Sequence, residues 1–199
     1  MKDRAIIMAE IIESQEEAYS SGKGSQSVEV QLAKHRERIL KSIYNNGYSP
    51  VSRDEINTHN DMTDTLDEIM KIKNNSPEEL ERRLRGMTDS VTAYIDHIVT
   101  VRTVALTELT AIKVEIMTTA RAMNGLYKQS LAMFAGKAAG MLTRYGYNTT
   151  TEATNRRYLR VHDLMMVSVR PCYSYAKFIE QINKIEAAVV DYIRSEEVK

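Results

Sequence analysis

The feature that most constrains the fold is the stretch from Ser76 to Tyr145, because it carries the signals of one very long helix. Ser76 can cap a helix, and Pro77 suits a first helical position because that position needs no N–H group. Glu79 lies at the third helical position, from which it can reach back to the cap. These three residues therefore predict a helix that begins at residue 77.

The apolar residues after this start follow the spacing of a single helix face. They recur every three or four positions, at Leu80, Leu84, Met87, Val91, Tyr94, Ile98, Val101 and Ala105. The pattern then shifts by one position and continues to Met123. We expect a helix over about 77–124, with an alternative in which it continues to 145 with a bend at Gly125.

The other segments also read as helices, and no strand pattern or internal repeat is evident. Only eight of the 199 residues are glycine and three are proline, which favours helix over a turn-rich β protein. We predict an all-α fold of six or seven helices around the long helix. An N-terminal amphipathic helix over 1–21 is expected to precede a single all-helical domain over 27–199, joined to it by a Gly/Ser-rich linker.

Composition excludes some classes of protein and favours others. The formal net charge is zero, so the whole chain is not a bulk nucleic-acid binder. Eleven methionines and eleven tyrosines supply much of the large apolar surface, and both residue types suit protein interfaces. Residues 51–81 carry nine acidic and three basic side chains, whereas 109–170 carry nine basic and three acidic ones. Such zones can pair within one chain or between copies.

A row of small residues is the candidate interface. Ala132, Gly136 and Gly140 fall four positions apart in a segment with helical spacing. Small side chains at this spacing let another backbone approach closely. Because glycine inside a helix costs about 1 kcal/mol relative to alanine, two glycines there suggest a packing role.

A basic cluster is the candidate nucleic-acid contact. Arg156, Arg157 and Arg160 lie on a predicted helix, and Tyr158 lies among them. Arginine can bind phosphate, and tyrosine can stack on bases. A solvated helix face, or a partner for the acidic zone, explains the same residues, and no known nucleic-acid-binding motif accompanies them.

No catalytic, cofactor or metal motif is present in the sequence. The four histidines form no metal-binding pattern, and the phosphate-binding and dinucleotide-binding glycine motifs are missing. The one cysteine, Cys172, cannot form an internal disulfide, and a small buried residue is its simplest interpretation. We therefore expect no enzyme activity, no cofactor and no bound metal.

The residues together favour a non-enzymatic structural or assembly protein that forms a homo-oligomer or binds other protein subunits. A virus or phage particle is one such assembly. The alternative is a nucleic-acid-binding accessory factor that uses the Arg/Tyr helix. No run approaches the roughly 18 apolar residues needed to span a membrane. We expect a cytoplasmic protein, or one within a virus particle assembled in the cytoplasm.

Overall fold

The computed structural model describes residues 3–21, 27–72, 76–122, 126–148, 152–168, 172 and 174–195. Its regular elements are helices, which confirms the predicted all-α fold. The long helix is also confirmed, since α4 has 46 residues, or about 69 Å at 1.5 Å per residue. In chain order the helices are α1 (Arg4–Ser21), α2 (Val28–Asn45), α3 (Arg53–Lys71), α4 (Pro77–Ala122), α5 (Tyr127–Arg144), α6 (Glu152–Ser168) and α7 (Tyr175–Ile193).

The long helix does not continue to residue 145. Helix α4 ends at Ala122 and α5 begins at Tyr127, and Gly125 lies outside the described residues. Lys137 of α5 bonds Glu115 of α4 at 2.6 Å, and Arg144 bonds Glu108 at 2.7 Å. Because the partner's number falls as the α5 number rises, α5 runs antiparallel to α4. The alternative of a continued, bent helix was therefore wrong, and the chain reverses instead.

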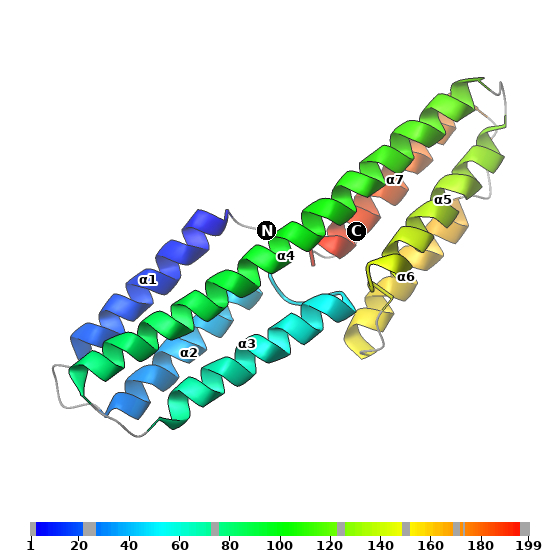
Figure 1. Ribbon diagram of the computed structural model, residues 1–199. Coiled ribbons are helices and arrows are strands. Elements are labelled where there is room, and N and C mark those ends of the chain that lie inside the picture. The colour runs from blue at the N-terminus through cyan, green and yellow to red at the C-terminus, as the bar shows by residue number, and fades with distance from the viewer. Residues whose placement is uncertain are drawn as a thin grey trace. The chain divides into compact units, whose positions relative to one another are not determined.

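The chain divides into two compact units. Unit 1 comprises Met1–Pro50 and Glu55–Val99, and unit 2 comprises Val51–Asp54 and Thr100–Lys199. Within unit 1, helices α1, α2 and α3 pack with the first part of α4, and within unit 2 the rest of α4 packs with α5, α6 and α7 (Figure 1). The single domain expected over 27–199 stays a prediction, because two units that share a helix can form one domain or two.

The two units repeat the same arrangement of helices and buried positions, which the sequence analysis did not detect. Helices α2 and α5 each have 18 residues, and the first residue of α2, Val28, corresponds to the first residue of α5, Tyr127. When the two helices are aligned in this way, six buried positions of α2 coincide with six of α5. The pairs are Gln31 and Ser130, Leu32 and Leu131, His35 and Phe134, Ile39 and Ala138, Ser42 and Met141, and Ile43 and Leu142.

The remaining helices match in the same way. The first part of α4 corresponds to α7, and α1 corresponds to the part of α4 within unit 2. In both cases matched residues differ in number by as much as Tyr94 and Tyr192 do. Buried pairs include Leu84 and Ile182, Val91 and Val189, Ile7 and Ala105, and Ile11 and Leu109. We call two residues related in this way equivalent. Met62 and Leu66 of α3 likewise match Val161 and Met165 of α6. Each unit is thus a four-helix bundle with the same pattern of buried positions.

Polar contacts repeat along with the buried positions. Glu10 accepts a bond from Asn46, as Glu108 does from Tyr145, and Glu17 pairs with Arg38, as Glu115 does with Lys137. A third equivalent pair of contacts joins Thr88 to Gln15 at 3.1 Å and Glu186 to Lys113 at 2.5 Å. Equivalent residues can therefore be compared contact by contact.

The same helix end closes α2 and α5. Gly47 and Gly146 have φ angles of 84° and 71°, a left-handed conformation that glycine adopts without strain. The next residue in each case, Tyr48 or Tyr147, donates its N–H back to the last turn of the helix, to Ile43 or Leu142. Each tyrosine therefore lies in the core of its own unit.

A buried tyrosine hydroxyl holds each of these helix ends. Tyr94 donates to the carbonyl of Tyr48 at 2.8 Å, and Tyr192 donates to the carbonyl of Tyr147. We predict that Tyr94→Phe and Tyr192→Phe each lower the free energy of unfolding by about 1–3 kcal/mol, because each leaves a buried carbonyl without this bond. Urea denaturation measures the loss, and Tyr127→Phe is the control, since its side chain is only partly buried. A loss no larger than the control's would show that these bonds do not stabilise the helix ends.

Candidate interaction surface

The outward side of α4 in unit 2 is exposed and almost free of charge. Of the nine exposed positions between residues 100 and 118, only Glu115 is charged. Val104 is 48% exposed and Val114 is 59% exposed, which is high for valine. The uncharged exposed residues are Thr100, Thr103, Val104, Thr107, Thr110, Ala111, Val114 and Thr118.

The threonines on this side bond back to their own helix. The hydroxyls of Thr107, Thr110 and Thr118 donate to the carbonyls of Thr103, Leu106 and Val114, at 2.8–3.0 Å. Because these hydroxyls already have acceptors, burial of the threonines costs little in lost hydrogen bonds. The surface thus behaves as a more apolar one than its sequence suggests.

The predicted small-residue row lies beside this surface and is open. Ala132, Gly136 and Gly140 of α5 are exposed, and a Cβ atom added to either glycine would meet nothing within 4 Å. Neither glycine therefore packs against another described residue, and the interface role assigned to the row stays a prediction. Met133, the residue after Ala132, is 48% exposed.

Two ion pairs join the uncharged side of α4 to the small-residue row of α5. Lys137 and Arg144 of α5 bond Glu115 and Glu108 of α4, and they form a seam between the uncharged side of α4 and the small residues of α5. Glu108 also accepts from the hydroxyl of Tyr145 at 2.8 Å, and this bond raises the pKa of Tyr145. We call the whole surface the α4–α5 face. It consists of Val104, Thr107, Ala111, Val114 and Thr118 on α4 and of Ala132, Met133, Gly136 and Gly140 on α5.

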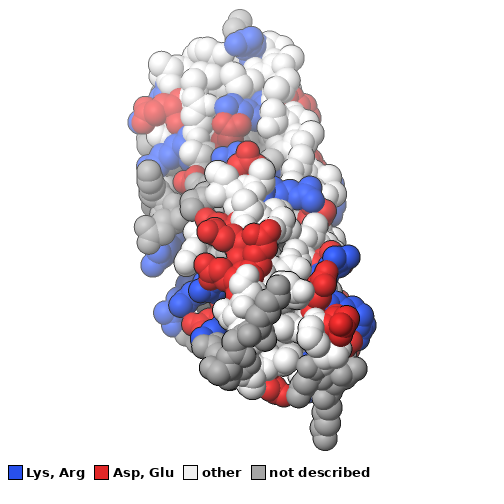
Figure 2. All heavy atoms as spheres, turned by 90° about the vertical axis from the view of Figure 1, so that its left-hand side faces the viewer, with Lys and Arg blue, Asp and Glu red and all other residues white. Residues whose placement is uncertain are grey.

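Unit 1 carries charges on the equivalent surface. The ion pair Glu17–Arg38 is present there, as Glu115–Lys137 is in unit 2, but the exposed residues around it differ. Figure 2, which looks from the side of α1, α2 and α3, shows charged side chains of both signs and a group of acidic ones. Five positions change from charged in unit 1 to uncharged in unit 2: Glu13 to Ala111, Glu16 to Val114, Lys34 to Met133, Glu37 to Gly136 and Lys41 to Gly140.

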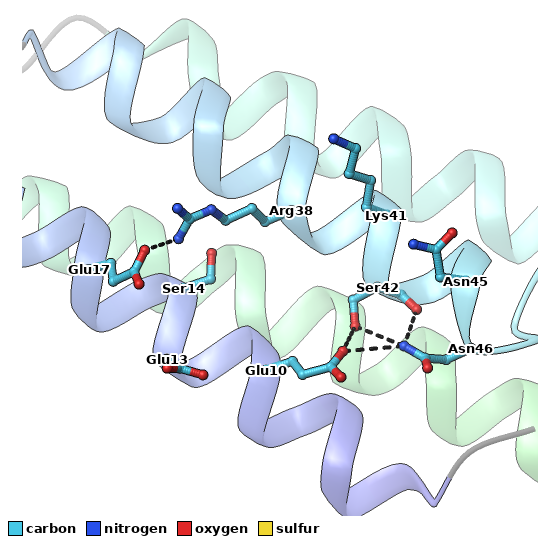
Figure 3. A pocket seen from close by; sticks show the side chains of 9 residues that line it. All are labelled: Glu10, Glu13, Ser14, Glu17, Arg38, Lys41, Ser42, Asn45 and Asn46. Carbon is cyan, nitrogen blue, oxygen red and sulfur yellow. Dashed lines mark hydrogen bonds and ion pairs between the residues drawn. The ribbon is translucent and has the colours of Figure 1, made fainter.

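A polar groove lies between α1 and α2 on this side of unit 1. Its volume is about 430 Å³, and it is open to solvent. Glu10, Ser42 and Asn46 converge in it (Figure 3), and Glu10 accepts bonds from Ser42 at 2.8 Å and from Asn46 at 3.3 Å. Carboxylate and cationic side chains both line the groove, and its bonds join α1 to α2. It is therefore a solvent-exposed polar contact between two helices, without the shape of an enclosed ligand site.

One histidine is buried beside this groove. His35 is 1% exposed, and its Nδ1 lies 3.0 Å from the hydroxyl of Ser14. Burial, and then the charge of Arg38, lower the pKa of His35 to about 4. Its buried Nε2 atom has no hydrogen-bond partner among the residues that the structure describes. His35 is therefore neutral at pH 7, because burial disfavours its charged form.

The predicted nucleic-acid residues do not form one surface. Arg157 lies over the ring of Tyr192, 5.8 Å from its centroid, and donates to Ser195. Tyr158 is partly buried, and its ring lies 6.3 Å from that of Tyr192, so it packs against the core instead of offering a free stacking face. Arg156 and Arg160 are exposed, one turn apart on α6. Exposure of these two arginines neither supports nor contradicts a nucleic-acid contact, which therefore stays a prediction.

Cys172 is buried, and its burial raises the pKa of the thiol, which disfavours the reactive thiolate. Among the described residues, no group of three or more His, Cys, Asp or Glu side chains is arranged to hold a metal ion. Within the same part of the chain, no helix is both long and apolar enough to cross a membrane.

Sequence reasoning found the small residues of α5 but not the uncharged side of α4. The available signal was the run of threonines between Thr100 and Thr118, whose spacing places them opposite the core residues. Comparison with known proteins adds no assignment to this surface: no protein-family model matches the chain, and no curated protein or solved structure is significantly similar to it.

Proposed function

We propose that this protein is a non-enzymatic structural or assembly protein that binds another protein surface through the α4–α5 face. The observation that supports this most directly is the difference between the two units at five equivalent positions. Unit 1 has Glu13, Glu16, Lys34, Glu37 and Lys41 where unit 2 has uncharged residues.

The comparison is informative because the two surfaces share one architecture. The fold accepts charged residues at these positions, as unit 1 demonstrates, so folding alone does not require their absence from unit 2. A solvated helix face is normally charged. Loss of charge, with exposed valine and methionine, is the composition expected of a surface that another protein covers.

The two glycines support the same proposal. Glycine in an exposed helix is destabilising by about 1 kcal/mol relative to alanine. Gly136 and Gly140 have open space around them, so no contact with the described part of the chain requires them. Close approach of a partner's backbone supplies a reason for both.

The test gives unit 2 the residues of unit 1. The variant Ala111→Glu, Val114→Glu, Met133→Lys, Gly136→Glu and Gly140→Lys is expected to keep its helical circular dichroism and its thermal midpoint. The new side chains on α5 would repeat the helical ion pair that Glu37 and Lys41 form at 3.2 Å. When the chain is immobilised, we expect this five-charge variant to bind at most about 10% of the partner protein that the wild type binds, because removing five charged side chains from water is costly.

A matched control places charges on another exposed surface of unit 2. The variant Ala176→Glu, Asn183→Lys and Ala187→Glu alters exposed positions of α7. This control variant is expected to bind as much partner protein as the wild type does. Equal retention by the wild type and the five-charge variant would overturn the proposal that the α4–α5 face is the binding surface.

A further inference from the structure

We infer that the partner on the α4–α5 face is a second copy of this chain, related by a two-fold axis that passes through the ion-pair seam. This inference rests on the proposed function and adds the identity and the register of the partner. Its arguments are the shape of the face, its charge and its size.

The shape of the face is self-complementary. The exposed side chains of Val114 and the threonines project from α4, and Gly136 and Gly140 leave open space on α5 beside them. We call these two features the ridge and the trough. A two-fold rotation about the seam between them brings the ridge of each copy over the trough of the other. An isologous contact requires this relation, because the same surface must serve both partners.

The ion pairs fix the register of the contact. Glu115 lies beside Lys137, and Glu108 lies beside Arg144. Each residue of α5 can therefore be matched to the residue of α4 that lies beside it. With the axis at the level of Glu115 and Lys137, each position of α4 meets the position of α5 in the other copy that is 22 higher in number. Val114 then lies over Gly136, Thr118 over Gly140 and Ala111 over Met133.

The charge of the face suits contact with itself. Glu108 and Glu115 are each paired with a basic residue of the same chain. The two seams that meet at the axis are therefore neutral overall, and neither repels the other. A strongly charged face would favour a partner of the opposite sign instead.

The size of the face indicates a weak dimer. In this register the 18 residues of α5 meet residues 105–122 of α4, a length of about 26 Å, and two adjacent helices are about 20 Å wide. The footprint is then about 500 Å² per copy, or about 1,000 Å² for both. This lies at the lower end of specific interfaces, where association is transient, so we expect dissociation in the micromolar range or above.

Cross-linking between two single-cysteine variants tests the register. Both carry Cys172→Ala, and one carries Val114→Cys and the other Gly136→Cys. When the two are mixed at about 200 μM and oxidised, the mixed disulfide is expected to exceed either self-linked dimer at least about fivefold, because only the mixed pair meets at the inferred interface. The control pair, Glu16→Cys and Glu37→Cys, occupies the equivalent positions of unit 1 and is expected to show no such excess.

Solution mass separates this inference from the proposed function. Sedimentation of the wild type from about 10 to 500 μM is expected to show a monomer–dimer equilibrium, which the five-charge variant weakens at least about 100-fold. A wild type that stays monomeric at 500 μM, or a mixed disulfide no more abundant than in the control pair, would overturn the second copy as partner. The proposed function would then still stand if the five-charge variant lost a different protein partner, and would fall if it lost none.

Discussion

Lowering the pH from 7 to 4 is expected to destabilise the protein by about 3 kcal/mol through His35 alone, from about 1.4 kcal/mol per unit of pKa difference. The pKa of this group is about 4 in the folded protein, compared with an ordinary value of 6.5. Between these values the unfolded chain binds a proton that the folded chain does not. Stability is therefore complete above pH 6.5 and falls as the pH drops toward 4. About 2 kcal/mol of the loss should be present at pH 5, and urea denaturation at pH 7, 6 and 5 measures it.

The control for this prediction comes from unit 2. The residues equivalent to Ser14 and His35 are Ile112 and Phe134, and both are buried in the core of that unit. The variant Ser14→Ile, His35→Phe should remove most of the pH dependence between 7 and 5. His59 contributes a smaller loss of the same sign, because burial also lowers its pKa. Glu79 titrates below this range, since hydrogen bonds from Arg82 and Arg83 lower its pKa to about 2. An unchanged pH dependence in the double variant would contradict the role given to His35.

Helix starts and ends were predictable because they depend on local chemistry. Ser27, Ser76 and Ser174 each accept a bond from the N–H three residues later, as serine at a helix cap should. The end of α2 before Gly47 follows equally from the need for a left-handed residue there. These signals lie within a few residues of the feature they specify, so one sequence is enough to read them.

The reversal after α4 was not predictable from the same information. Both α4 and α5 have helical spacing, and that spacing is the same for one bent helix and for two antiparallel ones. The difference lies in pairings such as Lys137 with Glu115, across 22 positions of the chain. Such contacts between distant parts of the sequence leave no local pattern.

The repeat was not predictable from the sequence, because equivalent positions of the two units share burial more often than they share the same residue. His35 and Phe134 occupy equivalent buried positions, and so do Ser42 and Met141, although these pairs share no chemistry. Close similarity survives mainly where geometry demands it, as in the Gly-Tyr pairs at 47–48 and 146–147. The uncharged side of α4 was missed for a related reason: its significance is visible only beside the charged surface of unit 1.

The substitution Phe134→His is expected to destabilise the protein by about 4 kcal/mol, more than the protonation of His35 does. Phe134 is fully buried, and histidine there would lose apolar contacts and place a polar ring in the core of unit 2. In unit 1 the equivalent ring is tolerated because Ser14 meets it at 3.0 Å, whereas unit 2 has Ile112 at the position of that serine. Urea denaturation at pH 8, where histidine is neutral, measures the loss without a contribution from protonation.

A double-mutant cycle separates the missing partner from the lost packing. Ile112→Ser alone also removes buried apolar surface and should destabilise the protein by about 2–4 kcal/mol. If a serine at 112 meets a histidine at 134 as Ser14 meets His35, the double variant should be more stable than the sum of the single losses by about 1 kcal/mol. Additive losses would instead mean that the two cores share buried positions without sharing side-chain geometry, and the equivalence of the two units would then extend to the backbone alone. A favourable coupling would show that one bundle design accepts either a polar or an apolar pair at this site, provided that both members change together.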